Sequence, residues 1–315
     1  MSVAGALEIT LIDVADDAAL ERWIAVHNVV NVRQYTPASF RAEMTFVVEH
    51  GEWLAALDGV DVGASAVGWS PASLESGVAF FDIAVVPETR GRGVGAALAE
   101  IAIAFARDQG LTVARTSVKD GDAASLRFAS RYGLEVVGSG QDGYLDLTPK
   151  HTRTAATLPP GVSITSFAER PDLERAIYDL EMLVYPEVPT LALEPLPSYT
   201  AWQAQTAGDP GFVPDLSLLA LRDARPIGLL LIYDNAEGTA YIGMTAIHPD
   251  SRRLGIARAL KIELAARAAR AGWRRLETFN DGTNERMRGL NEELGYTYRP
   301  RMLSLKGPMP DPRPG

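Results

Sequence analysis

A short run of arginines and glycines between a predicted strand and a predicted helix is the part of the sequence best suited to chemistry. It reads Arg-Gly-Arg-Gly-Val-Gly over residues 90–95, shortly after Pro87. Its three glycines allow a tight turn and let a ligand approach the main chain. The amides that follow are unpaired donors at the start of a helix, where the helix dipole adds partial positive charge. Such a turn can bind an anion such as a diphosphate, with Arg90 and Arg92 beside it.

The same turn occurs twice in the chain. Pro87, Arg90, Gly93, Gly110 and Gly133 are each followed 162 residues later by the same residue type, at Pro249, Arg252, Gly255, Gly272 and Gly295. A constant offset over this length indicates two copies of one domain. A single turn of this kind would be interpreted as a glycine-rich turn with solvated arginines, but its repetition in the same context favours a binding role.

Two other nucleotide-binding patterns fit less well. The phosphate-binding string G-x-x-x-x-G-K-[ST] does not occur. A dinucleotide fingerprint can be placed on Gly91, Gly93 and Ala96, but the second copy lacks equivalent glycines. Its strand also lies deep in the domain, whereas the fingerprint opens a βαβ unit.

The elements that position the turns follow one order in both copies. Apolar periodicity and turn residues predict, in the first copy, strands at 7–11, 53–57, 64–69, 78–86, 112–118 and 134–137, and helices at 18–30, 38–48, 94–109 and 123–132. In the second copy they predict strands at 162–166, 216–221, 227–233, 240–247, 276–279 and 298–303, and helices at 171–185, 198–205, 256–271 and 284–294. This order indicates an α+β fold in which each copy has a mixed, mostly antiparallel sheet flanked by helices.

The length suits two domains, which we place at 1–150 and 161–315. A polar, proline-rich segment at 151–160 is interpreted as the linker. The copies differ most in the segment from Val184 to Pro197, which is either an irregular connection or a wall of the substrate site.

Composition excludes several classes of function. The chain has no cysteine, so disulfides, a thiol nucleophile and thiolate metal sites are excluded, and its four histidines show no metal-ligand spacing. A net charge of −10 argues against nucleic-acid binding; it either attracts a cationic substrate or only keeps the protein soluble. No apolar run is long enough to cross a membrane, and no secretion signal is evident, so we expect a cytoplasmic protein. Its oligomeric state is not predicted.

The two turns resemble the signature of the GNAT acetyltransferase superfamily, R/Q-x-x-G-x-G/A between a strand and a helix. Arg90-x-x-Gly93-x-Gly95 and Arg252-x-x-Gly255-x-Ala257 both match it. The family's second landmark, an aromatic or leucine residue followed by glycine, is matched at Tyr132-Gly133 and Leu294-Gly295. The resemblance covers nearly the whole chain as a tandem pair.

The resemblance implies that acetyl-CoA binds as co-substrate to each turn, and that a small-molecule amine attacks its thioester directly. The residues it assigns to acetyl-CoA in the first copy are Ile83, Ala84, Val85, Arg90, Gly91, Arg92, Gly93, Val94 and Gly95. Those in the second copy are Thr245, Ala246, Ile247, Arg252, Arg253, Leu254, Gly255, Ile256, Ala257 and Asn284. The strand residues are expected to act through their backbone, with their side chains in the core.

The acid–base residues are less well specified. Asp82 occupies the family's acidic strand position, and burial in an apolar strand is expected to raise its pKa towards neutrality, unless it lies on a solvated face. The second copy has Met244 there, so Glu277 on the next strand is its candidate base. The family's general-acid tyrosine is replaced by Ala129 and Asn291, so another tyrosine or water must protonate the leaving thiolate.

Because that tyrosine is missing, a second function stays open. One or both copies would then bind acetyl-CoA or CoA without catalysis, as a sensor or a structural domain. The sequence leaves open which copy is catalytic and which amine is the acceptor.

Overall fold

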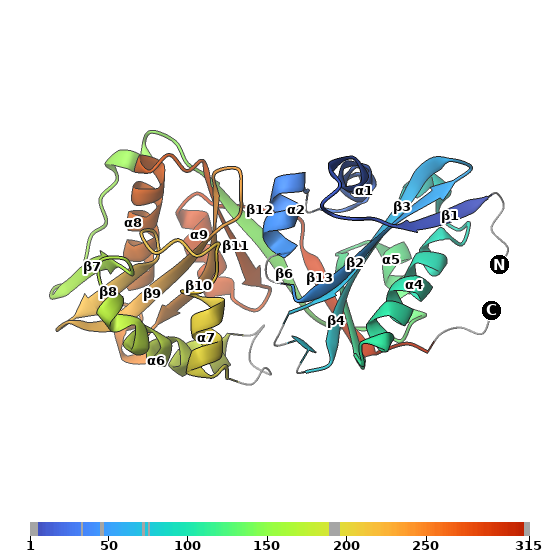
Figure 1. The fold of residues 1–315 in the computed structure, drawn as a ribbon. Coiled ribbons are helices and arrows are strands. Elements are labelled where there is room, and N and C mark those ends of the chain that lie inside the picture. The colour runs from blue at the N-terminus through green and yellow to red at the C-terminus, as the bar shows by residue number, and fades with distance from the viewer. Residues whose placement is uncertain are drawn as a thin grey trace. The chain divides into compact units, whose positions relative to one another are not determined.

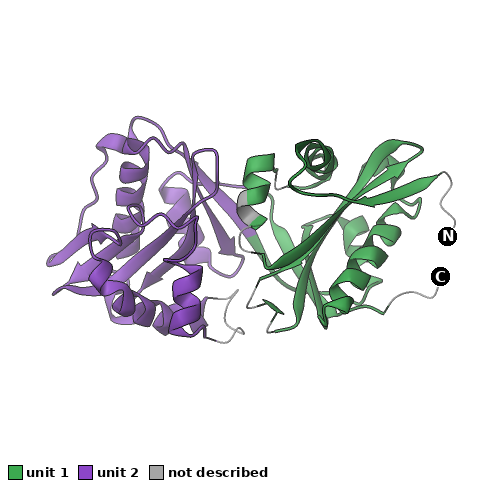
Figure 2. Ribbon diagram, viewed as in Figure 1, with its two compact units in different colours: residues 1–140, 300–315 green, residues 141–299 purple. Residues whose placement is uncertain are grey.

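The computed structural model describes residues 6–32, 34–44, 47–70, 73–74, 76–188 and 196–311, and divides into two compact units. Unit 1 comprises residues 1–140 and 300–315, and unit 2 comprises residues 141–299 (Figure 2). The last residues of the chain therefore belong to the unit built by the N-terminal copy, although the sequence boundaries assign them to the second copy.

Unit 1 is a mixed sheet covered by helices. Its strands lie in the order β1-β2-β3-β4-β5-β13-β6. The strands are β1 (Leu7–Leu11), β2 (Glu49–Leu57), β3 (Val60–Trp69), β4 (Val78–Val85), β5 (Val113–Lys119), β6 (Glu135–Asp146, which continues into unit 2) and β13 (Met302–Pro308). The helices are α1 (Asp17–Val30), α2 (Pro37–Met44), α4 (Val94–Asp108) and α5 (Ala123–Ser130), with a 3₁₀ turn at Pro87–Thr89.

Unit 2 repeats this order. Its strands β11-β10-β9-β8-β7 are neighbours in that sequence. They are β7 (Val162–Ser166), β8 (Leu218–Arg222), β9 (Arg225–Asp234), β10 (Thr239–Ile247) and β11 (Arg275–Asp281), with the short β12 (Thr297–Tyr298). The helices are α6 (Glu174–Val184), α7 (Tyr199–Gln205), α8 (Ile256–Arg270) and α9 (Glu285–Glu293), with 3₁₀ turns at His151–Arg153, Pro171–Leu173, Tyr185–Glu187 and Pro249–Ser251. The predicted α+β class is confirmed.

Each sheet has two apolar faces because side chains alternate along its strands. In unit 1, α1 and α4 lie on opposite sides of the sheet (Figure 1). Trp53, Ala55 and Leu57 of β2 pack with α4, whereas Leu54 packs with α1. Helix α4 buries Val94, Leu98, Ala102 and Ala106 at helical spacing. This packing fixes the start of α4 beside the end of β4.

The two parallel strand pairs separate at matching points. β4 pairs with β5 from Val78 to Phe81, and β10 pairs with β11 from Thr239 to Ile242, after which no further pairing is recorded along these described strands. At each of these junctions, where the parallel pairing ends, a threonine hydroxyl donates to the carbonyl of the last paired residue. Thr116 Oγ1 lies 2.8 Å from the Phe81 carbonyl oxygen, and Thr278 Oγ1 lies 3.5 Å from that of Ile242. Beyond the junctions, the last residues of β4 and β10 have one unpaired edge.

Strand β10 contains a bulge that β4 lacks. Its pairing with β9 skips Gly243, whereas β4 pairs with β3 without a break. The paired junction residues Phe81 and Ile242 are 161 positions apart, and Asp82 and Met244 are 162 apart, so Gly243 is a one-residue insertion in the second copy. A bulge leaves its extra residue outside the ladder and turns the strand, which explains why Ile242 faces α8 but Met244 faces α6.

The predicted terminal strand at 298–303 is wrong in its extent. Thr297 and Tyr298 form β12, which pairs with β6 in unit 2, and Met302–Pro308 form β13, which lies between β5 and β6 in unit 1. Pro300 separates them, and proline cannot donate a ladder hydrogen bond. β6 is also much longer than expected.

The predicted linker is partly ordered. His151 is buried and its Nδ1 lies 2.9 Å from the Thr148 amide nitrogen, while the Arg270 guanidinium of α8 donates to the Thr152 carbonyl. The middle of the predicted 184–197 loop, residues 189–195, lies outside the described residues. No helix among the described residues is long and apolar enough to cross a membrane.

Candidate functional site

The two arginine–glycine turns have the same backbone. Gly93 and Gly255 are the residues before α4 and α8, and both are left-handed, with φ of 89° and 79°. Gly91 has φ of 78°, and the equivalent Arg253 has φ of 62°, a conformation that costs an L-residue energy. No side chain among the described residues caps either helix start. The first amides of α4 and α8 therefore remain available to an anion.

An arginine common to both copies ties each turn to the strand before it. Arg90 Nε donates to the carbonyl of Val85 at 3.1 Å, and Arg252 Nε donates to that of Ile247 at 3.1 Å. Arg252 also donates to Glu187 at 2.7 Å, and Arg90 lies 4.0 Å from Asp122. These arginines therefore hold the turn in shape, in addition to any contact with a ligand.

Two backbone edges face the point where the strands separate. The Val86 amide donates to Val62 and the His248 amide to Ile227, both towards the antiparallel neighbour. Because bonding direction alternates along an antiparallel strand, Ile83 and Thr245 point their N–H and C=O groups the other way, past the junctions. The same alternation places the main-chain groups of Ala84 and Ala246 within the ladders. Of the strand residues that the resemblance assigns to acetyl-CoA, these two therefore have the fewest main-chain groups available to a ligand.

The last position of the signature tolerates a small side chain. A Cβ atom on Gly95 would lie 3.4 Å from Val85 Cγ2 and 3.6 Å from Phe128, which is ordinary contact. That agrees with Ala257 at the equivalent place. The turn residues Val94 and Ile256 are buried in the core, whereas Leu254 is 45% exposed.

Asp82 lies in a polar cluster on the α1 face of β4. His27 Nε2 is 2.9 Å from Asp82 Oδ2, and the Asn31 amide donates to Oδ1 and Oδ2 at 3.1 and 3.3 Å. The carboxylate side chain is 43% exposed and the imidazole 2%. The sequence analysis missed His27. Its signal was the four-residue spacing of Trp23 and His27 on the buried face of α1, with Asn31 four residues further, just after the helix ends.

The expected rise in the pKa of Asp82 is wrong. Burial does act to raise this pKa, but hydrogen bonds from His27 and Asn31 and the charge of His27 outweigh it and leave the pKa below its ordinary value. Asp82 is therefore an ionised carboxylate at neutral pH.

Unit 2 has an apolar side chain at the same place. Met244 is 8% exposed and packs with α6 and Trp202. The carboxylate on this face is Glu181 of α6, which accepts a 2.7 Å hydrogen bond from Trp202 Nε1. Burial raises the pKa of Glu181 to about 7. The sequence analysis also missed Glu181, which is a charged residue within the apolar face of a predicted helix.

Glu277, the candidate base of the second copy, is held by other side chains. Arg299 donates to Oε1 at 2.7 Å and Asn235 to Oε2 at 3.3 Å. It pairs with Tyr241 on the parallel section of β10 and β11, before the strands separate. Both oxygens of this carboxylate are therefore engaged by neighbouring side chains, before the point where the strands separate.

In unit 2, a tyrosine hydroxyl lies beside the residue at the sequence position of the family's tyrosine. Asn291 occupies that position and donates to the Tyr298 hydroxyl oxygen at 3.0 Å and to Asn280 Oδ1 at 2.8 Å. The Tyr298 hydroxyl in turn donates to Asn280 Oδ1 at 2.7 Å. A Cβ on Gly143 of β6 would lie 2.8 Å from the Tyr298 ring, so a larger residue there would displace the ring. Burial raises the pKa of Tyr298, with the Asn291 hydrogen bond partly opposing it.

Asp122 and Asn284 both cap helices. Asp122 Oδ1 accepts from the amides of Ala124 and Ser125 at the start of α5, and Asn284 Oδ1 accepts from the Met287 amide at the start of α9. Asn284 therefore has a structural role besides the ligand contact implied by the resemblance.

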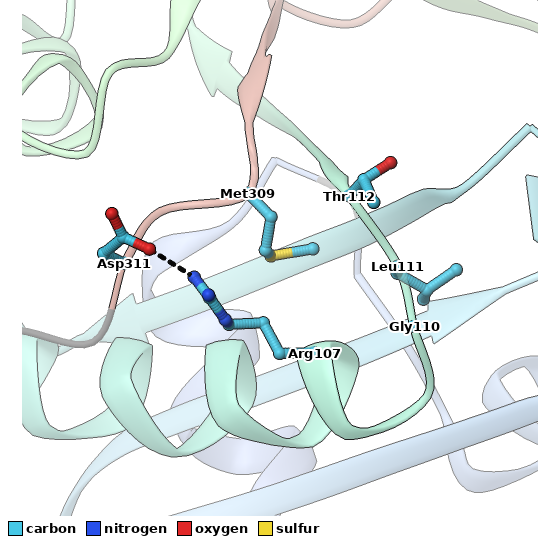
Figure 3. Close-up of a pocket in the computed structure, with 6 residues that line it drawn as sticks. All are labelled: Arg107, Gly110, Leu111, Thr112, Met309 and Asp311. Atoms are coloured by element: carbon cyan, nitrogen blue, oxygen red, sulfur yellow. Dashed lines mark hydrogen bonds and ion pairs between the residues drawn. The ribbon is translucent and has the colours of Figure 1, made fainter.

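A recess in unit 1 lies at the opposite end of α4 from the turn (Figure 3). Its walls are the last turn of α4, the start of β5 and the C-terminal segment, which Arg107 holds through Asp311 at 2.9 Å. Its turn at Gly110 follows a helix end, not a helix start, and its carboxylate at Asp311 is paired with Arg107. Across the described ranges, no group of three or more His, Asp or Glu side chains could hold a metal ion.

Comparison with known proteins agrees with this geometry. The sequence profile of the acetyltransferase (GNAT) family matches residues 17–134 and 175–296. A GCN5-related N-acetyltransferase from Sphaerobacter thermophilus is 19% identical with a TM-score of 0.77, over 97% of this chain and 96% of that chain. A tandem GNAT protein from the clavulanic acid biosynthesis pathway is 20% identical with a TM-score of 0.72, over 97% and 99%. No curated protein matches the chain. At these identities, the solved structures establish a shared fold.

Proposed function

Because the chain belongs to the GNAT family of acetyltransferases, we propose that it is an acetyl-CoA-dependent N-acetyltransferase acting on a small-molecule amine. One observation carries the proposal. Two helix starts with uncapped amides, each after a left-handed glycine, lie beside a strand whose edge is unpaired. This combination suits a ligand with a diphosphate at one end and an extended arm at the other.

The turn amides would hold the diphosphate of acetyl-CoA. In unit 1 these are the amides from Arg90 to Gly95, and in unit 2 those from Arg252 to Ala257. The main-chain groups of Ile83 and Thr245 would bind the extended arm, since they face the separation of the strands. Acetyl-CoA supplies the activated acetyl group, and the protein supplies position and hydrogen bonds.

Asp82 would bind the ammonium form of the acceptor amine in unit 1. It is ionised and partly exposed, and its strand borders the proposed thioester position. A carboxylate with a lowered pKa is a weak proton acceptor, so its main contribution is to bind and orient the amine. The ammonium proton would leave through water.

Unit 2 offers different groups to an acetyl-CoA bound in its own turn. Tyr298 is the hydroxyl that we assign to the thiolate leaving in unit 2, because it accepts a hydrogen bond from Asn291, the residue at the sequence position of the family's tyrosine. In unit 1 the thiolate would take its proton from water. The bulge at Gly243 offers main-chain groups outside the ladder, where charge would develop on the carbonyl oxygen.

The test is an acetylation screen with a panel of small amines, followed through released thiol. With the best amine, Asp82→Asn is expected to lower kcat/KM roughly 100-fold, because the ammonium loses its counter-charge. Asp120→Asn is the control, since Asp120 is ion-paired with Arg301 on the same sheet. Equal effects of the two substitutions would contradict the role of Asp82.

A second function has one observation in its favour. Met244 leaves unit 2 without a carboxylate on its central strand, which suits a domain that binds acetyl-CoA or CoA without turnover. If Gly255→Glu removes acetyl-CoA from unit 2 and leaves turnover unchanged, this function holds for unit 2.

A further inference from the structure

The ring of His27 in unit 1 contacts an acceptor through each nitrogen. Nε2 lies 2.9 Å from Asp82 Oδ2, and Nδ1 lies 3.2 Å from Asn28 Oδ1. The residue is only 1% exposed. A neutral imidazole can donate from only one nitrogen, so it would satisfy one of these contacts and set two lone pairs against each other at the other.

The orientation of the Asn28 amide is fixed by the main chain. Its Oδ1 accepts from the Tyr35 amide at 2.9 Å, and its Nδ2 donates to the Tyr35 carbonyl at 2.8 Å. A backbone N–H can only donate, so the Asn28 atom facing His27 is the oxygen. His27 Nδ1 must therefore carry a hydrogen.

The other nitrogen faces a carboxylate. Asp82 also accepts from Asn31 through both oxygens, which is the pattern of an ionised group. His27 Nε2 must then donate as well. We propose that His27 is a buried imidazolium ion that positions the Asp82 carboxylate for the acceptor amine.

The surroundings suit a buried cation. The ring stacks on Trp23 with centroids 5.0 Å apart and planes 17° apart, and Tyr35 approaches from another side at 4.9 Å. Aromatic faces attract a cation, and a buried charge needs a hydrogen-bonded counter-charge. Within the described residues, titratable groups that face the ring include Asp82 of β4 and the phenol of Tyr35.

The catalytic part of this proposal rests on the proposed function, in which Asp82 binds the ammonium group of the acceptor. A carboxylate has about four lone-pair positions. His27 and Asn31 hold it from the helix, which fixes its plane and leaves capacity on its exposed side for an ammonium group. His27 therefore acts through Asp82 and is a positioning residue.

The direct test needs no substrate. Nitrogen NMR of the full chain labelled with ¹⁵N-histidine would follow all the ring nitrogens, and His27→Gln would assign the signals of His27. Both ring nitrogens of His27 are expected to be protonated at pH 7.5, and Asp82→Asn is expected to remove one of these protons. An unprotonated ring nitrogen in the native chain at pH 7.5 would overturn the proposal.

The kinetic test uses the best amine from the acetylation screen. His27→Gln keeps a donor to Asp82 but no charge, so the acid limb of kcat/KM should move up by about one pH unit or more. His50→Gln, the same change at a histidine that pairs with Glu52, should leave that limb in place. A uniform loss at all pH values would mean that His27 is only structural, and would overturn the catalytic part. If no amine is acetylated, the proposed function fails and its catalytic consequence with it, but the NMR result still decides the charge of His27.

Discussion

At matching positions on β4 and β10, unit 1 carries Asp82 and unit 2 carries Met244. Asp82 joins a polar cluster with His27 and Asn31, whereas Met244 is part of an apolar core. The helix on this face supplies a histidine in unit 1 and a buried carboxyl group, Glu181, in unit 2. The carboxylate that we propose for binding an amine is thus present in unit 1 and replaced by an apolar side chain in unit 2.

The opposite holds on the side of β5 and β11. Unit 2 has the hydrogen-bonded group Asn280, Asn291 and Tyr298. At an offset of 162, unit 1 has Val118, Ala129 and Val136, and the first two pack with Leu305 of the C-terminal strand. The hydroxyl that we propose for protonating a thiolate is thus present in unit 2, and apolar side chains stand at these positions in unit 1.

The turns themselves hardly differ between the units, and the reason is physical. Their donors are main-chain amides, which require a left-handed residue and a helix but few particular side chains. Acid–base chemistry depends on particular side chains, so a single substitution of such a residue can remove it. We therefore expect both units to bind the ligand. We expect the units to differ in their acid–base groups, with Asp82 in unit 1 and Tyr298 in unit 2.

The largest expected effect separates the two binding turns. Gly93→Glu should abolish acetyl-CoA binding in unit 1 only, and Gly255→Glu in unit 2 only, because each adds bulk and negative charge beside the helix amides. Calorimetric titration of each variant measures this. Gly110→Glu and Gly272→Glu are matched controls, since these glycines have φ of 80° and 87° at the far ends of the same helices. Loss of binding in the controls would assign the effect to backbone strain.

Glu181 should make unit 2 less stable at alkaline pH. Its pKa is about 7 when folded and 4.5 when unfolded, so stability falls as pH rises between these values. Glu181→Gln should therefore stabilise the protein at pH 8 by up to about 3 kcal/mol and have little effect at pH 4. Urea unfolding at both pH values measures this, with exposed Glu100→Gln as control. A loss of stability at pH 8 would show that the charge is compensated.

Lys261 should have the opposite pH dependence. It is 2% exposed on α8, and burial lowers its pKa to about 8 from 10.5, so the buried charge destabilises below pH 8 and this penalty fades as pH rises towards 10.5. Lys261→Met should stabilise the protein at pH 7 by up to about 3 kcal/mol, less any cation–π attraction to Tyr296. The equivalent residue in unit 1 is Ala99. Thermal unfolding at pH 7 and pH 10, with exposed Lys306→Met as control, should show the gain only at pH 7.

The smallest expected effect exchanges one backbone position between the turns. Arg253→Gly should stabilise unit 2 by about 1 kcal/mol, because it relieves a left-handed arginine, and Gly91→Arg should cost unit 1 about the same. Neither should change acetyl-CoA affinity more than a few-fold, since the amides remain. Unfolding free energies and titrations of both variants check this. A large loss of affinity in Arg253→Gly would show that its side chain binds the ligand.

The turns, the order of the elements and the fold class could be predicted from the sequence because they depend on local patterns. Glycine spacing and a constant offset are enough to identify Gly93 and Gly255. The pairs His27–Asp82 and Asn291–Tyr298 could not be predicted in this way. Each pair joins residues from two different elements, and local patterns do not reveal how those elements pack against each other. The pKa of Asp82 is lowered because of its partners His27 and Asn31, so the prediction of a raised pKa, made without them, was wrong.

The bulge and the last strand failed for a different reason. Gly243 is a one-residue insertion within an apolar strand, and only the register with β9 exposes it. β13 joins unit 1 because Pro300 ends β12, and the sequence does not specify which sheet accepts the next strand.

The most direct measurement is the stoichiometry of acetyl-CoA bound to the native chain, by calorimetry or native mass spectrometry. We expect two equivalents per chain, one for each uncapped helix start. A chain that binds none would contradict the binding role of the turns, and so would a chain whose bound acetyl-CoA survives when Gly93 and Gly255 are both replaced by glutamate.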